Sequence, residues 1–143
     1  MRSLLLVPLA LQAIAMLVDE LVFHRRRGLP RWERIGHPLD TLTVVVAYVW
    51  LLAGGGLAGY AALAFFSCLF VTKDEPVHAR ACAAGEMWLH AVQFVLHPIA
   101  FLVFALLWRA GGHAAFLWIW LAVTALFGVH QTIYWNLIWK PAR

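Results

Sequence analysis

Two pairs of carboxylate and imidazole side chains have a spacing that suits metal binding. Glu20 and His24 are four residues apart, and so are Glu86 and His90. On an α-helix, residues four apart project from one face, about 40° apart around the helix axis. Three further pairs are closely spaced: His37 with Asp40, Asp74 with His78, and His130 with Tyr134. These clusters predict a site where oxygen and nitrogen atoms converge.

A polar stripe runs along the predicted helix over residues 75–108, which is otherwise apolar. Asp74 and Pro76 suit the cap and the first turn of this helix. The members of the stripe lie within about 60° of one another on that helix: Glu86, His90, Gln93 and His97. Ionisable groups in apolar helices are costly and usually face the interior of a bundle. We therefore expect the stripe to face the other acids and histidines.

The residue types in these clusters are those of transition-metal ligands. Carboxylates and imidazoles on facing helices hold paired iron or manganese ions in helical bundles, and the same types suit zinc. We predict a metal site that holds two iron ions. Its candidate ligands are Glu20, His24, His37, Asp40, Asp74, His78, Glu86, His90, His97 and His130. The candidate catalytic groups are Asp40 and Tyr134.

Three kinds of function would use such a site. The favoured hypothesis is an oxidoreductase of the hydroxylase or desaturase type, with a di-iron centre that acts with dioxygen on a lipid-like substrate. A zinc-dependent membrane hydrolase or a metal carrier would need only three or four protein ligands. A b-type haem electron-transfer protein would use two of His90, His97 and His130, and would leave the acids without a role.

Some polar residues are expected to lie outside the site. The side chain of Glu33 is expected in solvent, and Asp19 is expected beside an arginine. Cys82 has no cysteine partner at C-x-x-C spacing, so we expect a free thiol.

The elements that carry these residues are predicted from composition. Hydrophobic residues make up 64% of the 143 residues and charged residues 13%, whereas about a quarter is charged in soluble domains. Runs of about 18 or more uncharged apolar residues indicate membrane spans. We predict one all-α domain over residues 1–143, an integral membrane helical bundle in contact with the lipid bilayer, with no nucleic-acid partner.

Five transmembrane helices are predicted, with four as the alternative. The ambiguous stretch is 41–71, which is too long for a single span of ordinary tilt. Three consecutive glycines at 54–56 interrupt it and predict a turn. The expected spans cover residues 3–23, 39–53, 57–72, 75–108 and 114–139, with a basic loop at 24–39.

Charge placement predicts the orientation of these spans. With five spans, every Lys and Arg except Arg2 and Arg109 falls on one side of the membrane. Basic loops mark the cytoplasmic side, so the N-terminus is expected outside and the acids at the cytoplasmic end. We expect a multi-pass protein of a bacterial-type inner membrane. Its site would face the cytoplasm, where a lipid-like substrate could reach it.

Overall fold

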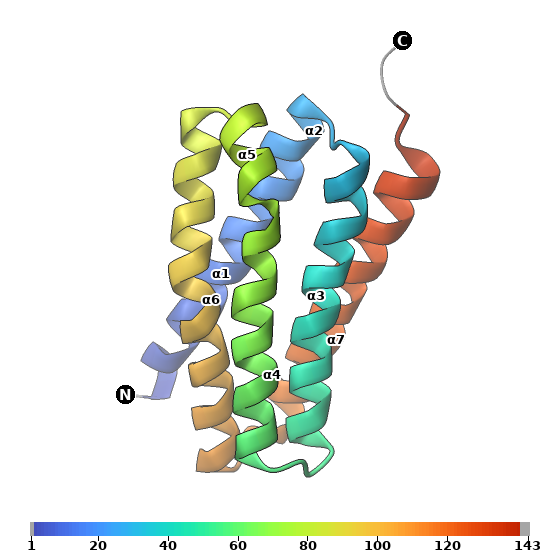
Figure 1. Cartoon of the computed structure of the whole chain (residues 1–143). Coiled ribbons are helices and arrows are strands. Elements are labelled where there is room, and N and C mark those ends of the chain that lie inside the picture. Colours follow the sequence, from blue (N-terminus) through green and yellow to red (C-terminus); the bar gives the residue numbers. More distant parts are fainter. Residues whose placement is uncertain (1, 141–143) are drawn as a thin grey trace.

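The chain folds into a bundle of helices that run alternately up and down (Figure 1). The computed structural model describes residues 2–140, which contain no strand. The elements in chain order are η1 (Arg2–Leu5), α1 (Leu6–Val18), η2 (Asp19–His24), α2 (Arg25–Arg27), α3 (Arg31–Leu52), α4 (Leu57–Phe70), η3 (Val71–Asp74), α5 (Glu75–Ala81), α6 (Ala84–Ala110), α7 (Ala114–Ile133) and η4 (Tyr134–Ile138).

These elements join into five continuous helices that are long and apolar enough to cross a membrane. Within residues 2–140 they cover Leu6–Arg27, Arg31–Leu52, Leu57–Ala81, Ala84–Ala110 and Ala114–Ile138. The prediction of an all-α bundle with five membrane-length helices is therefore confirmed, and the alternative with four is not. The second and third helices have 22 and 25 residues, so each is longer than the sequence suggested.

The helices form two layers. In Figure 1, α6, α4 and α3 lie in front, and α1 and α7 lie behind them. Helix α1 packs against α6, while α3 packs against both α4 and α7. Near the lower end, Tyr48 of α3 stacks on Phe104 of α6, with ring centroids 3.8 Å apart. The Tyr60 hydroxyl of α4 donates to the carbonyl of Phe101 at 2.7 Å. These aromatic side chains thus join α3 and α4 to α6 within the front layer.

The turn at the three glycines joins α3 to α4 at the lower end of the bundle (Figure 1). Gly54 has a φ of 86°, a backbone conformation that glycine adopts without the steric penalty of a Cβ atom. The indole of Trp50 donates to the carbonyl of Gly56 at 3.1 Å and closes the turn. The predicted position of this turn is confirmed.

The expected loop over residues 24–39 is wrong, because most of it is helical. The first helix continues to Arg27 and α3 already begins at Arg31. Pro38 lies inside α3, where a proline leaves the carbonyl four residues earlier without its helical partner. That carbonyl belongs to Arg34 and accepts a hydrogen bond from the Asn136 side chain at 3.1 Å. A neighbouring helix thus replaces the lost bond, so the helix continues.

The expected single helix over residues 75–108 is also wrong. Pro76 lies in the first turn of α5, which continues from α4 through the tight turn η3. The chain reverses instead at Cys82 and Ala83, whose backbone is extended. No Gly or Pro occupies these two positions, so the sequence does not mark the reversal. As a result, the residues expected in one helix belong to two, α5 and α6, which this turn separates.

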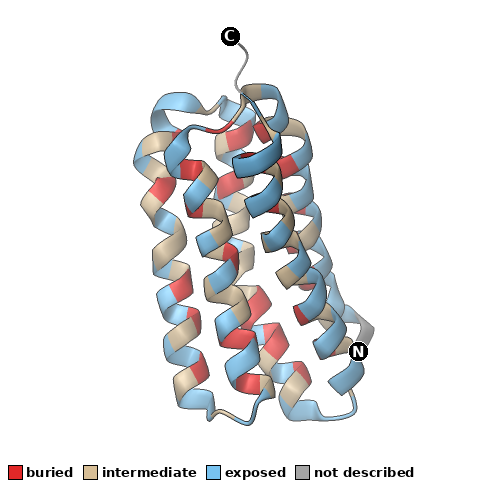
Figure 2. Ribbon diagram, turned by 90° about the vertical axis from the view of Figure 1, so that its right-hand side faces the viewer, coloured by how far each residue is buried: buried red, intermediate tan, exposed pale blue. Residues whose placement is uncertain are grey.

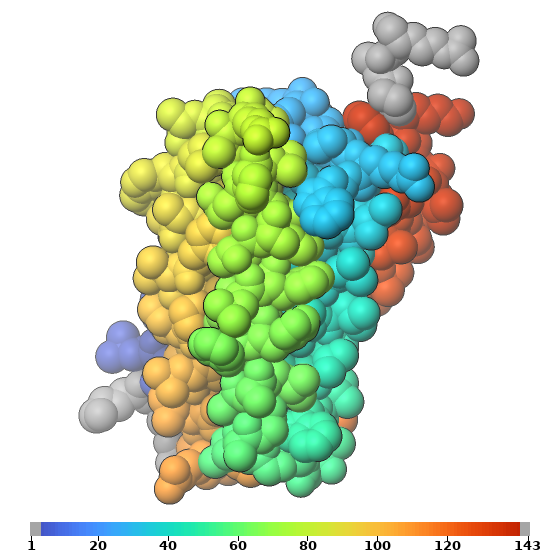
Figure 3. Space-filling model, viewed as in Figure 1, coloured from blue at the N-terminus to red at the C-terminus, as the bar shows by residue number. Residues whose placement is uncertain are grey.

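The outer surface of the bundle is apolar. Exposed residues cover the outward faces of the helices along their whole length (Figure 2). Many of them are large and hydrophobic, such as Phe65, Leu102 and Leu126, which are 66%, 59% and 66% exposed. Figure 3 shows the face seen in Figure 1 as a space-filling view, in which α4 fills the front between α6 and α3. Helices that are apolar on their outward faces are suited to contact lipid.

Cysteine labelling tests the up-and-down arrangement. We expect Gly56→Cys and Arg26→Cys to react with a membrane-impermeant maleimide from opposite sides of the membrane, in a background that carries Cys68→Ala and Cys82→Ala. Both positions are exposed, and a Cβ at Gly56 meets no other atom. In intact cells only Gly56→Cys should react, whereas Arg26→Cys should need permeabilised cells. Reaction of both from one side would contradict the arrangement.

Candidate metal centre

Histidines from four elements form a ring at the upper end of the bundle. They are His24 of η2, His37 of α3, His78 of α5 and His90 of α6. Around the ring, the centroids of neighbouring imidazoles are 4.7 Å (His24–His37), 6.2 Å (His37–His78), 4.1 Å (His78–His90) and 6.3 Å (His90–His24) apart. The structure thus brings together histidines that are up to 66 residues apart in the chain.

A carboxylate or a thiol flanks each side of this histidine ring. The flanking residues are Glu20 beside His24 and His37, Glu33 beside His37 and His78, Cys82 beside His78 and His90, and both Asp19 and Glu86 beside His90 and His24. In each group the potential ligand atoms lie within 4.8 Å of one another. Ligands that share one ion have similar separations, because each lies about 2.0–2.3 Å from the metal. Every side of the ring is therefore a candidate metal position.

The wide turn η2 contributes three of these side chains. It is a π-helical turn over Asp19–His24, a distortion that is frequent at functional sites. His24 lies between its two acids: Nε2 is 3.3 Å from Oδ1 of Asp19, and Nδ1 is 3.6 Å from Oε2 of Glu20. Both carboxylates and the imidazole are buried. One turn of the first helix therefore places one acid on each side of His24.

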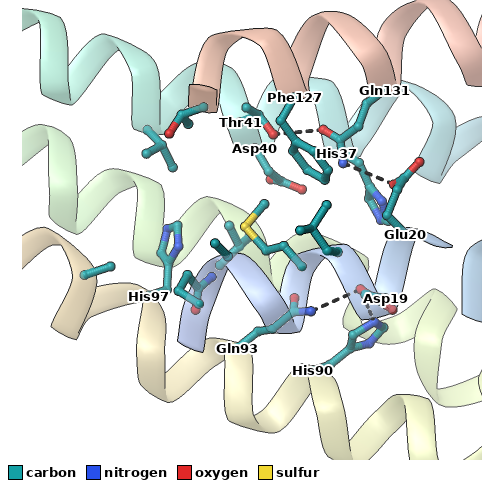
Figure 4. Close-up of a pocket in the computed structure, with 18 of the residues that line it drawn as sticks. Asp19, Glu20, His37, Asp40, Thr41, His90, Gln93, His97, Phe127 and Gln131 are labelled. Carbon is teal, nitrogen blue, oxygen red and sulfur yellow. Dashed lines mark hydrogen bonds and ion pairs between the residues drawn. The ribbon is translucent and has the colours of Figure 1, made fainter. Parts of the chain in front are cut away.

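Hydrogen bonds from α7 and η4 hold the Glu20 carboxylate in place. The indole of Trp135 donates to Oε1 at 2.5 Å, and the amide of Gln131 donates to Oε2 at 3.4 Å. The Thr41 hydroxyl in turn donates to the Gln131 side chain at 2.9 Å (Figure 4). Groups that orient a ligand in this way raise metal affinity in known sites.

Asp19 is held from the opposite side of the cavity. His90 Nε2 and the amide of Gln93, both on α6, lie 3.1 and 3.3 Å from its Oδ2 (Figure 4). We expected Asp19 beside an arginine, so that expectation is wrong. The carboxylate instead links the first helix to α6 through an imidazole and an amide.

Arg27 joins two buried acids at the edge of the ring. Its guanidinium donates to Glu33 at 2.7 and 3.3 Å and to Glu86 at 3.0 and 3.2 Å. Glu33 is completely buried, at 0% exposure, so the expectation that it lies in solvent is wrong. Burial of a carboxylate is tolerated when it is paired and hydrogen-bonded, and Arg27 supplies both.

Several polar atoms of the centre are buried without a hydrogen-bond partner. Within the described chain these include both ring nitrogens of His24, Nε2 of His78, Nδ1 of His90 and Oδ1 of Asp19. The contacts of His24 with its acids have ion-pair distances but do not have the geometry of hydrogen bonds. Buried polar atoms in folded proteins nearly always have a partner. A cation bound among these nitrogen and oxygen atoms would supply the missing partner by accepting their lone pairs.

Asp40 and Asp74 lie at the cavity but are not members of the metal groups formed by the described residues. Both carboxylates contact the ammonium of Lys73, at 2.6 Å from Asp40 and 2.8 Å from Asp74. The structure therefore pairs these two predicted ligands with a lysine, beside the histidine ring.

Three other predicted site residues also lie outside the ring. His97 lies at the far end of the cavity (Figure 4), and its Nε2 is 3.0 Å from the Ser67 hydroxyl. The His130 side chain is 41% exposed, with Nε2 3.9 Å from Glu20. Tyr134 stacks on His130 with ring centroids 5.5 Å apart, and it does not line the cavity.

Two of the residues that sequence reasoning left out could have been found by spacing. Glu33 and His37 are four residues apart, like Glu20 and His24. Cys82 stands four residues after His78, and the thiol is free as expected. Burial raises the pKa of that thiol to about 12, so without a cation it stays protonated.

A cavity of about 240 Å³ extends from the histidine ring toward the middle of the bundle. His24, His37, His78 and His90 lie at one end of it, and the rest of the lining is mostly apolar. Aromatic residues such as Phe101, Trp120 and Phe127 line the remainder. The cavity therefore combines a polar end that could hold metal with an apolar chamber beside it.

Comparison with known proteins adds no relative to this picture. No protein-family model, no curated protein and no solved structure matches the chain. Because one fold can host many functions, the function is inferred from the residues of the centre.

Replacement of Arg27 tests whether it balances the buried acids. Arg27→Met should lower the free energy of unfolding by about 3 kcal/mol, because removal of one partner leaves buried carboxylates uncompensated. The matched control is Arg26→Met, which removes the same charge from an exposed position and should have little effect. Thermal or denaturant unfolding of the purified proteins in detergent measures both. Equal stability of the two variants would contradict this role for Arg27.

Proposed function

We propose that the protein is an integral membrane metalloprotein with a dinuclear centre in the histidine ring, and that it acts as an oxidoreductase on a lipid-like substrate. One observation carries this proposal. The buried ring divides into two sets of ligands that share no residue, Asp19, His24, Glu86 and His90 on one side and Glu33, His37 and His78 on the other. Carboxylates and imidazoles from facing helices are how helical bundles hold paired iron ions.

The charge of the centre supports two cations. Each of its carboxylates is exposed by 6% or less: Asp19, Glu20, Glu33 and Glu86. Arg27 donates to two of them, which leaves two without a permanently charged partner. Isolated charges are costly in an apolar interior. Divalent cations at the ring would offset this negative charge and would use the neutral imidazoles as ligands.

The proposed reaction is hydroxylation or desaturation of a hydrocarbon. In hydroxylation, one oxygen atom of dioxygen enters a C–H bond and the other leaves as water, while a donor supplies two electrons and two protons are taken up. Iron would supply the activation of dioxygen. The cavity supports this reaction because apolar side chains would position a hydrocarbon beside the ring and exclude water.

Asp40 is the proposed proton donor. It lines the same cavity and contacts Lys73 at 2.6 Å, and the lysine side chain is 17% exposed. A proton could thus pass from the surface to the cavity. Tyr134 does not line the cavity, so this proposal gives it no catalytic step.

A b-type haem is less well supported. Of the three axial ligands predicted for it, His97 contacts the Ser67 hydroxyl at 3.0 Å at the far end of the cavity, and the His130 side chain is 41% exposed. His90 packs directly on His78, with ring centroids 4.1 Å apart, which leaves no space between these two rings for the plane of a porphyrin. This alternative also gives no role to the acids.

Zinc hydrolysis is the second candidate, and one group favours it. The thiol of Cys82 lies beside His78 and His90, and catalytic zinc sites have three protein ligands, imidazole and thiolate among them, with a fourth position left open. Glu86, which also lies beside His90, could then act as general base. A metal carrier would use the same ligands without a reaction.

The membrane setting is also part of the proposal. The ring lies at the end of the bundle that carries the basic residues Arg25, Arg26 and Arg31, all of which are exposed. Basic residues mark the cytoplasmic side, so the centre would face the cytoplasm of a bacterial-type inner membrane. Exposed arginines there could also attract anionic lipid headgroups.

Metal content tests the centre directly. Protein purified without added metal should contain one or two transition-metal ions per chain, measured by elemental analysis. His90→Ala should lose most of this metal, because His90 is a ligand in the larger of the two sets and its imidazole packs on His78 of the other set. His97→Ala is the matched control, since it removes an imidazole from the same helix and cavity but from outside the groups. Equal metal in both variants would rule out the centre as described.

The identity of the metal separates the two candidate functions. For the di-iron centre we expect iron and a weak near-ultraviolet absorption band, and Cys82→Ser should keep its metal because the thiol belongs to neither ligand set. For the zinc site, the protein should contain zinc, and Cys82→Ser should lose it. Elemental analysis and the optical spectrum of both proteins distinguish these outcomes.

A further inference from the structure

The cavity beside the centre has an exposed rim on two helices. Among the described residues that line it, only Leu17 and Val123 are exposed, at 45% and 56%. Leu17 belongs to α1 and Val123 to α7. The lining just inside this rim includes Ala13 of α1 and Thr124 of α7, which are half-buried. The cavity therefore reaches the surface between these two helices.

The packing of the bundle explains why the opening lies there. Helix α1 packs against α6, and α7 packs against α3. The pair α1 and α7 is not among the helix pairs that pack closely in the described chain. On the opposite side, α4 fills the space between α6 and α3 (Figure 3). The back layer thus contains a seam, whereas the front layer is continuous.

Contacts between the first and last helices close the seam at its upper, polar end. There Trp135 and Gln131 donate to Glu20, and the guanidinium of Arg25 lies 5.0 Å from the centroid of the Tyr134 ring. Leu17 and Val123 lie below these contacts, near the middle of the continuous helices Leu6–Arg27 and Ala114–Ile138. The opening therefore faces the hydrocarbon region that surrounds the bundle rather than the aqueous end.

We infer that a long hydrocarbon chain of a membrane lipid enters sideways between α1 and α7 and lies in the cavity. The lining that the chain would meet is apolar, with Phe101, Trp120 and Phe127 along its path. The polar headgroup stays outside, because contacts across the upper seam block its passage. Only the part of this inference that makes the chain a substrate of the histidine ring rests on the proposed function.

Photochemical cross-linking tests the inference. Protein in lipid nanodiscs is irradiated with a phospholipid, or with a free fatty acid, that carries a diazirine in the middle of its chain. Adducts are then mapped by mass spectrometry. Ala13→Phe should fill the cavity from α1, and Thr124→Phe should fill it from α7. The matched control is Ala10→Phe, which makes the same change on α1 at an exposed position outside the lining. Metal content is measured on every sample.

We expect adducts on Phe101, Trp120 or Phe127 in the unaltered protein. Ala13→Phe and Thr124→Phe should reduce these adducts by about tenfold, because each phenyl ring would occupy space in the cavity that the chain would otherwise take. Metal content and adducts on the outer surface should not change, and Ala10→Phe should resemble the unaltered protein. Comparison of the two probes shows whether the chain belongs to a phospholipid or to a free acid.

Two results would overturn the inference. One is the absence of cavity adducts with both probes, and the other is equal cavity adducts in Ala13→Phe, Thr124→Phe and the unaltered protein. If such a protein still contains metal, the lateral route fails and the metal centre stands. If a metal-free protein gives the expected adducts, the route stands and the proposed function fails.

Discussion

The upper half of this bundle depends on the burial of negative charge in an apolar interior. Asp19, Glu20, Glu33 and Glu86 are all buried close to the same histidines. An uncompensated carboxylate in such a place would ionise only at a large energetic cost. Arg27 and the hydrogen bonds from Trp135 offset part of that cost. The remaining lone pairs converge on positions that a cation would satisfy, which links the stability of this end to its chemistry.

Irregular backbone is concentrated where these charges lie. The π-helical turns η2 and η4, the reversal at Cys82–Ala83 and the proline in α3 all lie at this end. At the other end the helices pack around stacked aromatic rings such as Tyr48 and Phe104. Departures from regular helix are often found at functional sites. The lower half therefore stabilises the bundle, while the irregular backbone of the upper half directs side chains inward.

Sequence predicted the parts of the site that local spacing determines. Glu20 with His24 and Glu86 with His90 were found because four-residue spacing defines one helix face. The pairing of Asp19 with His90 could not be found in this way, because the two are 71 residues apart. His78 was among the predicted ligands, but its place on a helix separate from that of His90 was not predicted, since it depends on a chain reversal at two positions that hold neither Gly nor Pro. Similarly, the loop that Pro38 predicted is absent. The side chain of Asn136, on another helix, donates to the Arg34 carbonyl that the proline leaves without a helical partner.

Glu20 lies between the histidine ring and the upper seam, and it belongs to neither of the two proposed ligand sets. Its carboxylate is held by Trp135 and Gln131, and these bonds tie the first helix to the last across the upper seam. The same carboxylate lies beside His24 and His37 in one of the candidate metal groups. Coordination of a cation would compete with the indole and the amide for the oxygen lone pairs, because a carboxylate has a limited number of them. A cation in the group of Glu20, His24 and His37 would then affect how closely the first helix approaches the last.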